Sequence, residues 1–198
     1  ELNPFYTKAY FSLGNSYLRV GKATEGRAAL QTFQKLSLEN EQITHLKRLV
    51  QQYPQKTDLW YQLGQLQMKR KNWESATTAF EKCIALEPQQ ARGYEARGYI
   101  YFQRGNYEDA LKMYTASVQH QPDNASYRNS LGGMYMMLKR YPKAIEQYQE
   151  AIRLKPSEPR FHRHLSKAYE SAGEIALADE VYRRYEELKA KSRPGTAP

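Results

Sequence analysis

The sequence predicts an all-α protein in which pairs of helices repeat along the chain and stack into a solenoid. Two observations support this prediction. A pattern of residue types recurs every 34 residues along the chain of 198 residues, and each copy contains two stretches with apolar residues at helical spacing. Because stacked repeats contact mainly their neighbours, such a chain needs no single central core.

The repeat is clearest between Thr57 and Asn124, where two successive copies match position by position. Each copy has an aromatic residue, a glycine, an alanine, a second aromatic residue and a proline, in that order. These residues are Trp60, Gly64, Ala76, Phe80 and Pro88, followed by Tyr94, Gly98, Ala110, Tyr114 and Pro122. The pattern continues at Gly132, Ala144, Tyr148 and Pro156, and then at Ser166, Ala178 and Tyr182.

The recurring glycines and prolines each have a physical role in a pair of helices. A glycine inside a helix costs about 1 kcal/mol relative to alanine, so its recurrence needs a reason. We expect the partner helix to approach closely at this position. Proline ends the second helix because it lacks the amide hydrogen. Between the two helices, Gly105 and Gly173 suit a turn with positive φ.

This spacing and these residue types resemble the tetratricopeptide repeat, a helix–turn–helix unit. The resemblance covers nearly the whole chain and implies antiparallel helix pairs stacked into a right-handed superhelix. Gln67, Arg97, Arg128 and His162 depart from the pattern, because apolar or aromatic residues recur at their positions. We expect these four departures to weaken single contacts without breaking the period.

The period divides the chain into repeats and flanking segments. Leu2-Asn3-Pro4 resembles the repeat endings at Pro88 and Pro156, so residues 1–6 are expected to end an earlier repeat that has been cut away. Five repeats are expected at residues 7–40, 57–90, 91–124, 125–158 and 159–191, the last with a capping helix, separated by an insertion at 41–56 and followed by a disordered tail at 192–198.

The insertion at residues 41–56 is the one irregularity in the period. Its apolar residues, among them Ile43, Leu46 and Val50, follow helical spacing and end before Pro54. Asn40 is a candidate N-cap. Two interpretations are open: a separate short helix, or a continuation of the preceding helix. We favour the separate helix.

Composition narrows the classes of function. The net charge of +9 suggests an acidic or nucleic-acid partner, but the basic residues concentrate toward the two ends of the chain. Most of the 17 tyrosines fall at recurring packing positions, which argues against stacking on bases. No apolar run approaches the roughly 20 residues of a membrane span. Cys83 is the only cysteine and is expected to be a small buried residue.

The sequence carries no catalytic signature. It has no glycine-rich phosphate loop, no paired-histidine metal helix and no nucleophile elbow. His162 and His164 are two residues apart, so on a helix they point in different directions and make a poor metal pair. We therefore expect neither enzyme activity nor a cofactor in this segment. The alternative is that the segment regulates an enzyme, or recruits its substrate, and that the catalytic domain of that enzyme lies outside this chain.

The family resemblance implies a candidate binding surface on the first helix of each repeat, which lines the concave groove. At the groove positions the chain carries apolar and aromatic residues in the middle and cations in the last repeat. The predicted groove residues are Phe11, Asn15, Leu18, Tyr61, Gln65, Met68, Tyr99, Phe102, Asn129, Met136, Arg160, Arg163 and Lys167.

This surface predicts a protein or peptide partner with apolar anchors and acidic residues. In family members that clamp the tails of chaperones, a lysine and an asparagine of the first repeat hold the terminal carboxylate. Asn15 is present here, but Phe11 stands where the lysine is needed. The sequence therefore favours an interaction scaffold or adaptor module of a longer polypeptide over a chaperone clamp. Nucleic-acid binding is the weaker alternative.

Overall fold

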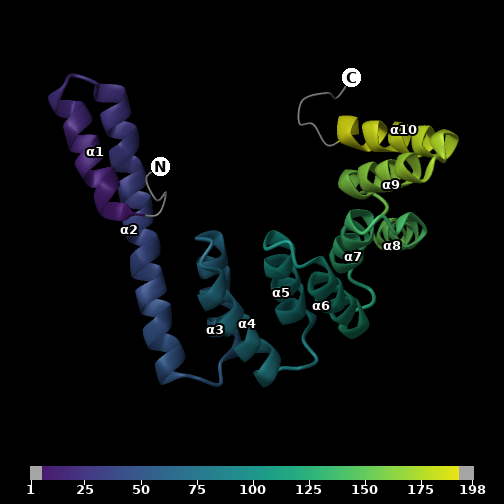
Figure 1. Ribbon diagram of the computed structural model, residues 1–198, viewed down its shortest axis with the longest axis horizontal. Helices are drawn as coiled ribbons and strands as arrows, with labels where there is room; N and C mark the ends of the chain where they lie inside the picture. The colour runs from purple at the N-terminus through teal and green to yellow at the C-terminus, as the bar shows by residue number, and fades with distance from the viewer. Residues whose placement is uncertain (1–5, 192–198) are drawn as a thin grey trace. The chain divides into compact units, whose positions relative to one another are not determined.

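The computed structural model describes residues 6–191, and over these residues it consists of ten α-helices (Figure 1). The chain divides into two compact units, residues 1–86 and 87–198. The predicted tail at 192–198 lies outside the described residues, as does all but the last residue of the predicted repeat ending at 1–6.

The first unit contains four helices packed as two antiparallel pairs. They are α1 (Thr7–Arg19), α2 (Ala23–Gln52), α3 (Thr57–Lys69) and α4 (Trp73–Leu86). The second unit contains three such pairs: α5 (Ala91–Gln103) with α6 (Tyr107–His120), α7 (Ala125–Met137) with α8 (Tyr141–Leu154), and α9 (Pro159–Ala172) with α10 (Ile175–Lys191). This arrangement confirms the predicted all-α architecture of antiparallel helix pairs.

The prediction of a separate helix at residues 41–56 is wrong, because α2 is one continuous helix of 30 residues. Its buried residues recur at alternating steps of three and four with no change of phase, from Leu36 through Glu39, Ile43 and Leu46 to Val50. A helix can therefore bury a single stripe along its whole length. Neither glycine nor proline interrupts this stretch, so nothing ends the helix before Pro54.

The long α2 helix packs against two other helices, one along each half of its length. Its first half packs against α1, where Gly14 and Gly26 bring the two backbones together. Its second half packs against α3 through a cluster that contains Ile43, Leu46 and Leu63. The sixteen extra residues thus extend a helix of the first repeat to form the surface on which α3 lies.

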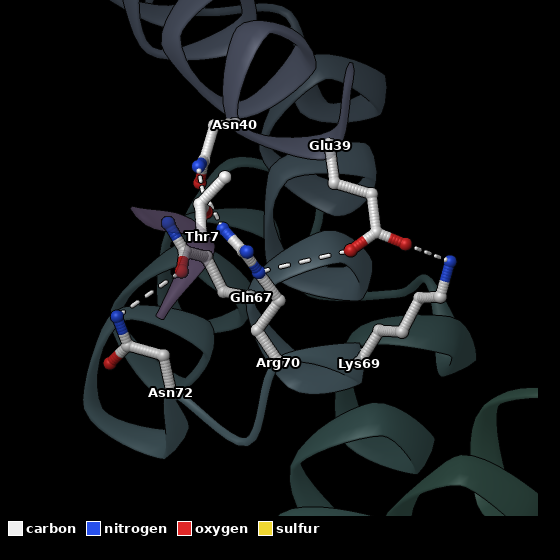
Figure 2. A network of polar contacts seen from close by, with 7 residues as sticks. All are labelled: Thr7, Glu39, Asn40, Gln67, Lys69, Arg70 and Asn72. Atoms are coloured by element: carbon white, nitrogen blue, oxygen red, sulfur yellow. Dashed lines mark hydrogen bonds and ion pairs between the residues drawn. The ribbon is translucent and has the colours of Figure 1, made fainter. Parts of the chain in front are cut away.

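A polar network marks the point where α2 changes partner (Figure 2). The carboxylate of Glu39, a buried residue, lies 2.6 Å from the ammonium of Lys69 and 3.8 Å from the guanidinium of Arg70. The side chain of Asn40, predicted as an N-cap, instead donates a hydrogen bond to the Thr7 hydroxyl and accepts one from Arg70. This network links the start of α1, the middle of α2 and the end of α3.

The recurring glycines lie where an aromatic ring of the partner helix approaches. A Cβ atom added to Gly64 would lie 2.6 Å from the ring of Phe80, and one added to Gly132 would lie 2.7 Å from the ring of Tyr148. Real Cβ atoms essentially never come this close to another heavy atom. The expected close approach is confirmed, and the group that approaches is the recurring second aromatic residue.

Arg128 and His162 replace the first aromatic residue of their repeats without weakening its contact, contrary to the expectation from the sequence. The indole of Trp60 donates a hydrogen bond to the carbonyl of Pro54, and the hydroxyl of Tyr94 donates one to Pro88. At the same repeat position Arg128 donates to Pro122 over 2.7 Å, and the Nε2 atom of His162 lies 2.9 Å from the carbonyl of Pro156. Because a carbonyl only accepts, the His162 Nε2 atom carries the proton. The four side chains at this repeat position therefore share one property. Each donates a hydrogen bond to the carbonyl of the proline that follows the previous helix.

The turns within the pairs adopt positive φ at one residue each. Gly105 and Gly173 do so as predicted, with φ of 77° and 84°. Lys71 and Lys139 occupy the same position with φ of 56°. A side chain in the left-handed region costs about 1–2 kcal/mol, and glycine avoids this cost.

We expect Lys139→Gly to stabilise the second unit by about 0.5–1 kcal/mol. The relief of the left-handed strain exceeds the entropy that glycine adds to the unfolded chain. The reverse change, Gly105→Lys, should destabilise by a similar amount. Thermal melting of both variants checks this expectation, and a lower melting temperature for Lys139→Gly would contradict it.

Candidate functional site

A pocket of about 390 Å³ opens on the first-helix side of the second unit. Three successive first helices, α5, α7 and α9, supply most of its wall, and side chains from α6 and α8 reach in between them. The lining residues are Tyr99, Phe102, Tyr114, Asn129, Ser130, Gly133, Met134, Met136, Met137, Tyr148, His164 and Lys167. Aromatic rings and methionine side chains therefore dominate the surface of the pocket.

Two tyrosines of the second helices connect the pocket with the packing of the repeats. The rings of Tyr114 and Tyr148 lie against Gly98 and Gly132, and both residues are buried. Within the described residues, neither hydroxyl makes a hydrogen bond to the protein. Burial raises the pKa of both phenols, for Tyr114 with a further contribution from the carboxylate of Glu95. Both hydroxyls therefore stay protonated and can donate to a bound group.

His164 forms the polar wall of the pocket together with Asn129. The His164 Nδ1 atom lies 2.7 Å from the Asn129 side-chain oxygen, and the His164 ring lies 5.7 Å from the Tyr148 ring. Burial lowers the pKa of His164, and the nearby charges of Arg163, Arg160 and Lys167 lower it further. The imidazole is therefore neutral near pH 7 and takes part as a hydrogen-bonding group.

Charged side chains lie on α5 and α9, the two outer helices of the pocket wall. At the α9 end, Arg163 and Lys167 are exposed and make no ion pair within the described residues. Arg160 is engaged, because its guanidinium lies 3.4 Å from the carboxylate of Glu158. On α5, Glu95 lies one helical turn before the lining residue Tyr99 and outside the residues that line the pocket. It is half-buried, and burial raises the pKa of its carboxyl group.

Five of the predicted groove residues line this pocket together. They are Tyr99, Phe102, Asn129, Met136 and Lys167. Arg160 and Arg163 lie on the same helix as Lys167, outside the residues that line the pocket. In the second unit, then, residues from three repeats that lie apart in sequence come together at one site.

The other predicted groove residues belong to the first unit and pack in different ways. Phe11 lies against Phe33 with ring centroids 5.1 Å apart, and Tyr61 lies 5.6 Å from Phe80. Leu18 packs against Gly26. Asn15 and Met68 are half-buried. Gln65 lines a separate pocket of about 480 Å³ between α2 and α3, together with Gln42, His45, Leu46, Leu49, Gln62 and Leu66.

Sequence reasoning missed several residues of the main pocket. Tyr114 and Tyr148 were assigned to packing, which is true of their rings but not of their hydroxyls. Ser130 and His164 each follow a predicted groove residue, Asn129 and Arg163, by one position, so they had not been included. The signal that could have found His164 is its spacing of three residues from Lys167, because residues three or four apart on a helix share a face.

Other kinds of site are not evident in the described part of the chain. Over residues 6–191, no group of three or more histidine, cysteine, aspartate or glutamate side chains could hold a metal ion. None of the helices described there combines the length and hydropathy that a membrane span requires. Cys83 is buried, as predicted, with its sulfur 3.6 Å from the carbonyl of Thr57.

Comparison with solved structures finds the same fold in MamA proteins. A crystal structure of MamA superposes with a TM-score of 0.69 at 20% identity, covering 90% of this chain and 95% of that chain. A MamA fragment from Desulfovibrio magneticus RS-1 gives a TM-score of 0.69 at 23% identity, with 94% and 96% covered. At this level of identity the likeness shows the fold alone. No curated protein matches the sequence significantly.

Models of the tetratricopeptide repeat match the sequence directly. One matches residues 57–90, and another matches residues 95–159 and 140–193. Together these matches span more than half of the chain. Repeats of this kind generally mediate interactions between proteins and are typically non-catalytic. The chain therefore belongs to the tetratricopeptide repeat family, and its helix pairs, recurring glycines and proline-ended helices are those of that repeat.

Proposed function

We propose that this protein is an interaction module that binds a segment of another protein, and that the segment anchors an apolar side chain in the pocket lined by α5, α7 and α9. The observation that carries the proposal is the pocket itself. Its volume of about 390 Å³ is within the range of ligand pockets, and its walls combine apolar side chains with a few polar groups.

The composition of the pocket suits an apolar anchor. Phe102, Met136 and Met137 present flexible or aromatic surface, and Met134 is a buried member of the lining. Methionine adapts to side chains of different shapes and makes favourable contacts with aromatic rings. Anchors of this kind supply most of the binding energy in interfaces.

The polar groups in the pocket suit a peptide backbone next to the anchor. The hydroxyls of Tyr114 and Tyr148 can donate to a carbonyl of the bound segment. His164 and Asn129 offer further donors and acceptors near the same wall. A buried peptide group needs such partners, because an unsatisfied amide or carbonyl costs about 1–3 kcal/mol. These groups thus favour a polypeptide over a purely apolar ligand.

Gly133→Leu tests the proposal, because Gly133 lines the pocket and has space above it. A Cβ added there would meet only the Tyr148 hydroxyl, at 3.8 Å. The leucine side chain should therefore fill the pocket while the helices keep their places. We expect it to weaken binding of an anchored peptide at least about fivefold, since the loss of one well-buried anchor costs about 1–3 kcal/mol or more.

A phage-displayed library of random twelve-residue peptides provides the ligand. Panning against the wild-type protein should enrich peptides with one or two large apolar residues, and the Gly133→Leu variant should not enrich them. Gly133→Ala, which adds one methyl group and leaves most of the pocket open, is the matched control. Equal enrichment on the wild type and Gly133→Leu would contradict the proposed site.

A further inference from the structure

Glu95 is a charged group of the second unit that the packing of the repeats does not explain. It is half-buried on α5, one helical turn before Tyr99, and it acts electrostatically on Tyr114. Tyr99 and Tyr114 both line the pocket. Within residues 6–191, the Glu95 side chain forms neither an ion pair nor a hydrogen bond. A partly desolvated carboxylate without a cation is unfavourable, and a cation from a ligand would relieve this.

We propose that Glu95 is the receptor for a basic side chain of the bound segment, so that the site selects a segment with a basic residue, an apolar anchor and an acidic residue in a row. This inference rests on the proposed function and specifies the chemistry of its partner. Glu95 would bind the basic residue at the α5 end, the pocket would bind the anchor, and Arg163 and Lys167 would bind the acidic residue at the α9 end.

Charge complementarity carries this assignment. The two cations on α9 are exposed and have no counter-ion in the described residues, and the carboxylate on α5 has none either. A segment with two acidic ends would bring a like charge next to Glu95, which is costly where water is partly excluded. The acidic partner expected from the sequence therefore satisfies only one end of the site, because that expectation did not include Glu95.

The spacing of the helices predicts the spacing of the charges. A helix with its side chains is about 10–12 Å across, so the step from α5 through α7 to α9 covers about 20–24 Å. An extended segment advances about 3.3 Å per residue. Each charged residue should therefore lie about three positions from the anchor, one on each side. An extended segment can lie in either direction, so the order of the two charges along the sequence is left open.

Seven-residue synthetic peptides, capped at both ends, test this inference. All carry a central phenylalanine with alanine and serine spacers. The terminal residues are lysine and glutamate in either order, two glutamates, or two lysines. Fluorescence anisotropy at low ionic strength measures the affinity of each peptide for the wild-type protein. We expect one of the mixed-charge peptides to bind best, by about fivefold over the two peptides with like charges.

Reversal of the charge at position 95 should change the preference. In Glu95→Lys, the peptide with two glutamates should become the tightest ligand, and the mixed peptides should lose about fivefold or more. Asp123→Lys makes the same change of net charge at an exposed turn away from the pocket and should leave the ranking unchanged. Glu95→Gln, which keeps the shape of the side chain, should remove the preference for lysine if Glu95→Lys folds poorly.

The outcomes separate this inference from the proposed function. If the peptides bind and Gly133→Leu abolishes binding, but neither variant of Glu95 changes the ranking, the role of Glu95 is wrong and the pocket stands. If the ranking follows residue 95 but Gly133→Leu has no effect, the anchoring pocket is wrong and the role of Glu95 stands. If no peptide binds at millimolar concentration, both are wrong.

Discussion

Gly132→Leu should lower the free energy of unfolding of the second unit by about 2–4 kcal/mol, because the added side chain would overlap the ring of Tyr148. The first atom of that side chain would already lie 2.7 Å from a ring carbon, and Tyr148 is 4% exposed and has little room to move. The two helices would have to separate, which would reduce the burial of Ala144 and Leu165 in the same cluster.

The neighbouring residue provides the control. Gly133 lies on the same helix, one position further on, and lines the pocket. Gly133→Leu should be neutral or stabilise by up to about 1 kcal/mol, since leucine is a better helix former than glycine. Urea unfolding followed by circular dichroism measures both variants. Equal losses of stability would show that the contact between Gly132 and Tyr148 does not position α8.

Arg70→Met should destabilise the first unit by about 2 kcal/mol. The change removes the less exposed of the two cations that lie near the Glu39 carboxylate. The Arg70 and Glu39 side chains are 12% and 10% exposed, whereas that of Lys69 is 57% exposed. Lys69 lies closer to the carboxylate, at 2.6 Å against 3.8 Å. We nevertheless expect Arg70 to matter more, because solvent screens the exposed pair and Arg70 also binds Asn40.

Lys69→Met is the matched variant and should cost less than about 1 kcal/mol. A further variant separates the loss of attraction from the cost of an uncompensated charge. Combining Arg70→Met with Glu39→Leu removes the buried carboxylate as well, and should recover most of the stability. If the double variant loses as much free energy of unfolding as Arg70→Met and Glu39→Leu lose together, the network stabilises the unit by more than charge compensation.

The repeats were readable from the sequence because their determinants are local. The prolines at 88, 122 and 156 end helices through backbone chemistry, wherever the chain folds. Gly64 and Gly132 stood out because glycine is unfavourable inside a helix, so only a close contact explains it. The family was recognisable for the same reason: each repeat presents the same few backbone constraints at the same spacing.

The course of α2 was predictable only in part. The amphipathic stretch after Asn40 was found, but Asn40 was interpreted as the start of a new helix. In the structure, Glu39 occupies a position of the buried stripe, and its charge is compensated by cations from α3. A buried glutamate at the junction is stable only with those partners, and the sequence does not indicate which distant cations will be adjacent.

The sequence by itself determined the helix pairs, their period and their family, because glycines, prolines and apolar spacing act over a few residues. The tertiary structure decided which of these helix faces meet. It brought Tyr99, Asn129 and Lys167 from three repeats to one pocket, added the hydroxyls of Tyr114 and Tyr148 to it, and left Glu95 half-buried without a cation. Such features depend on contacts between residues far apart along the chain, and the free energy of burying a charge or a hydroxyl depends on those neighbours.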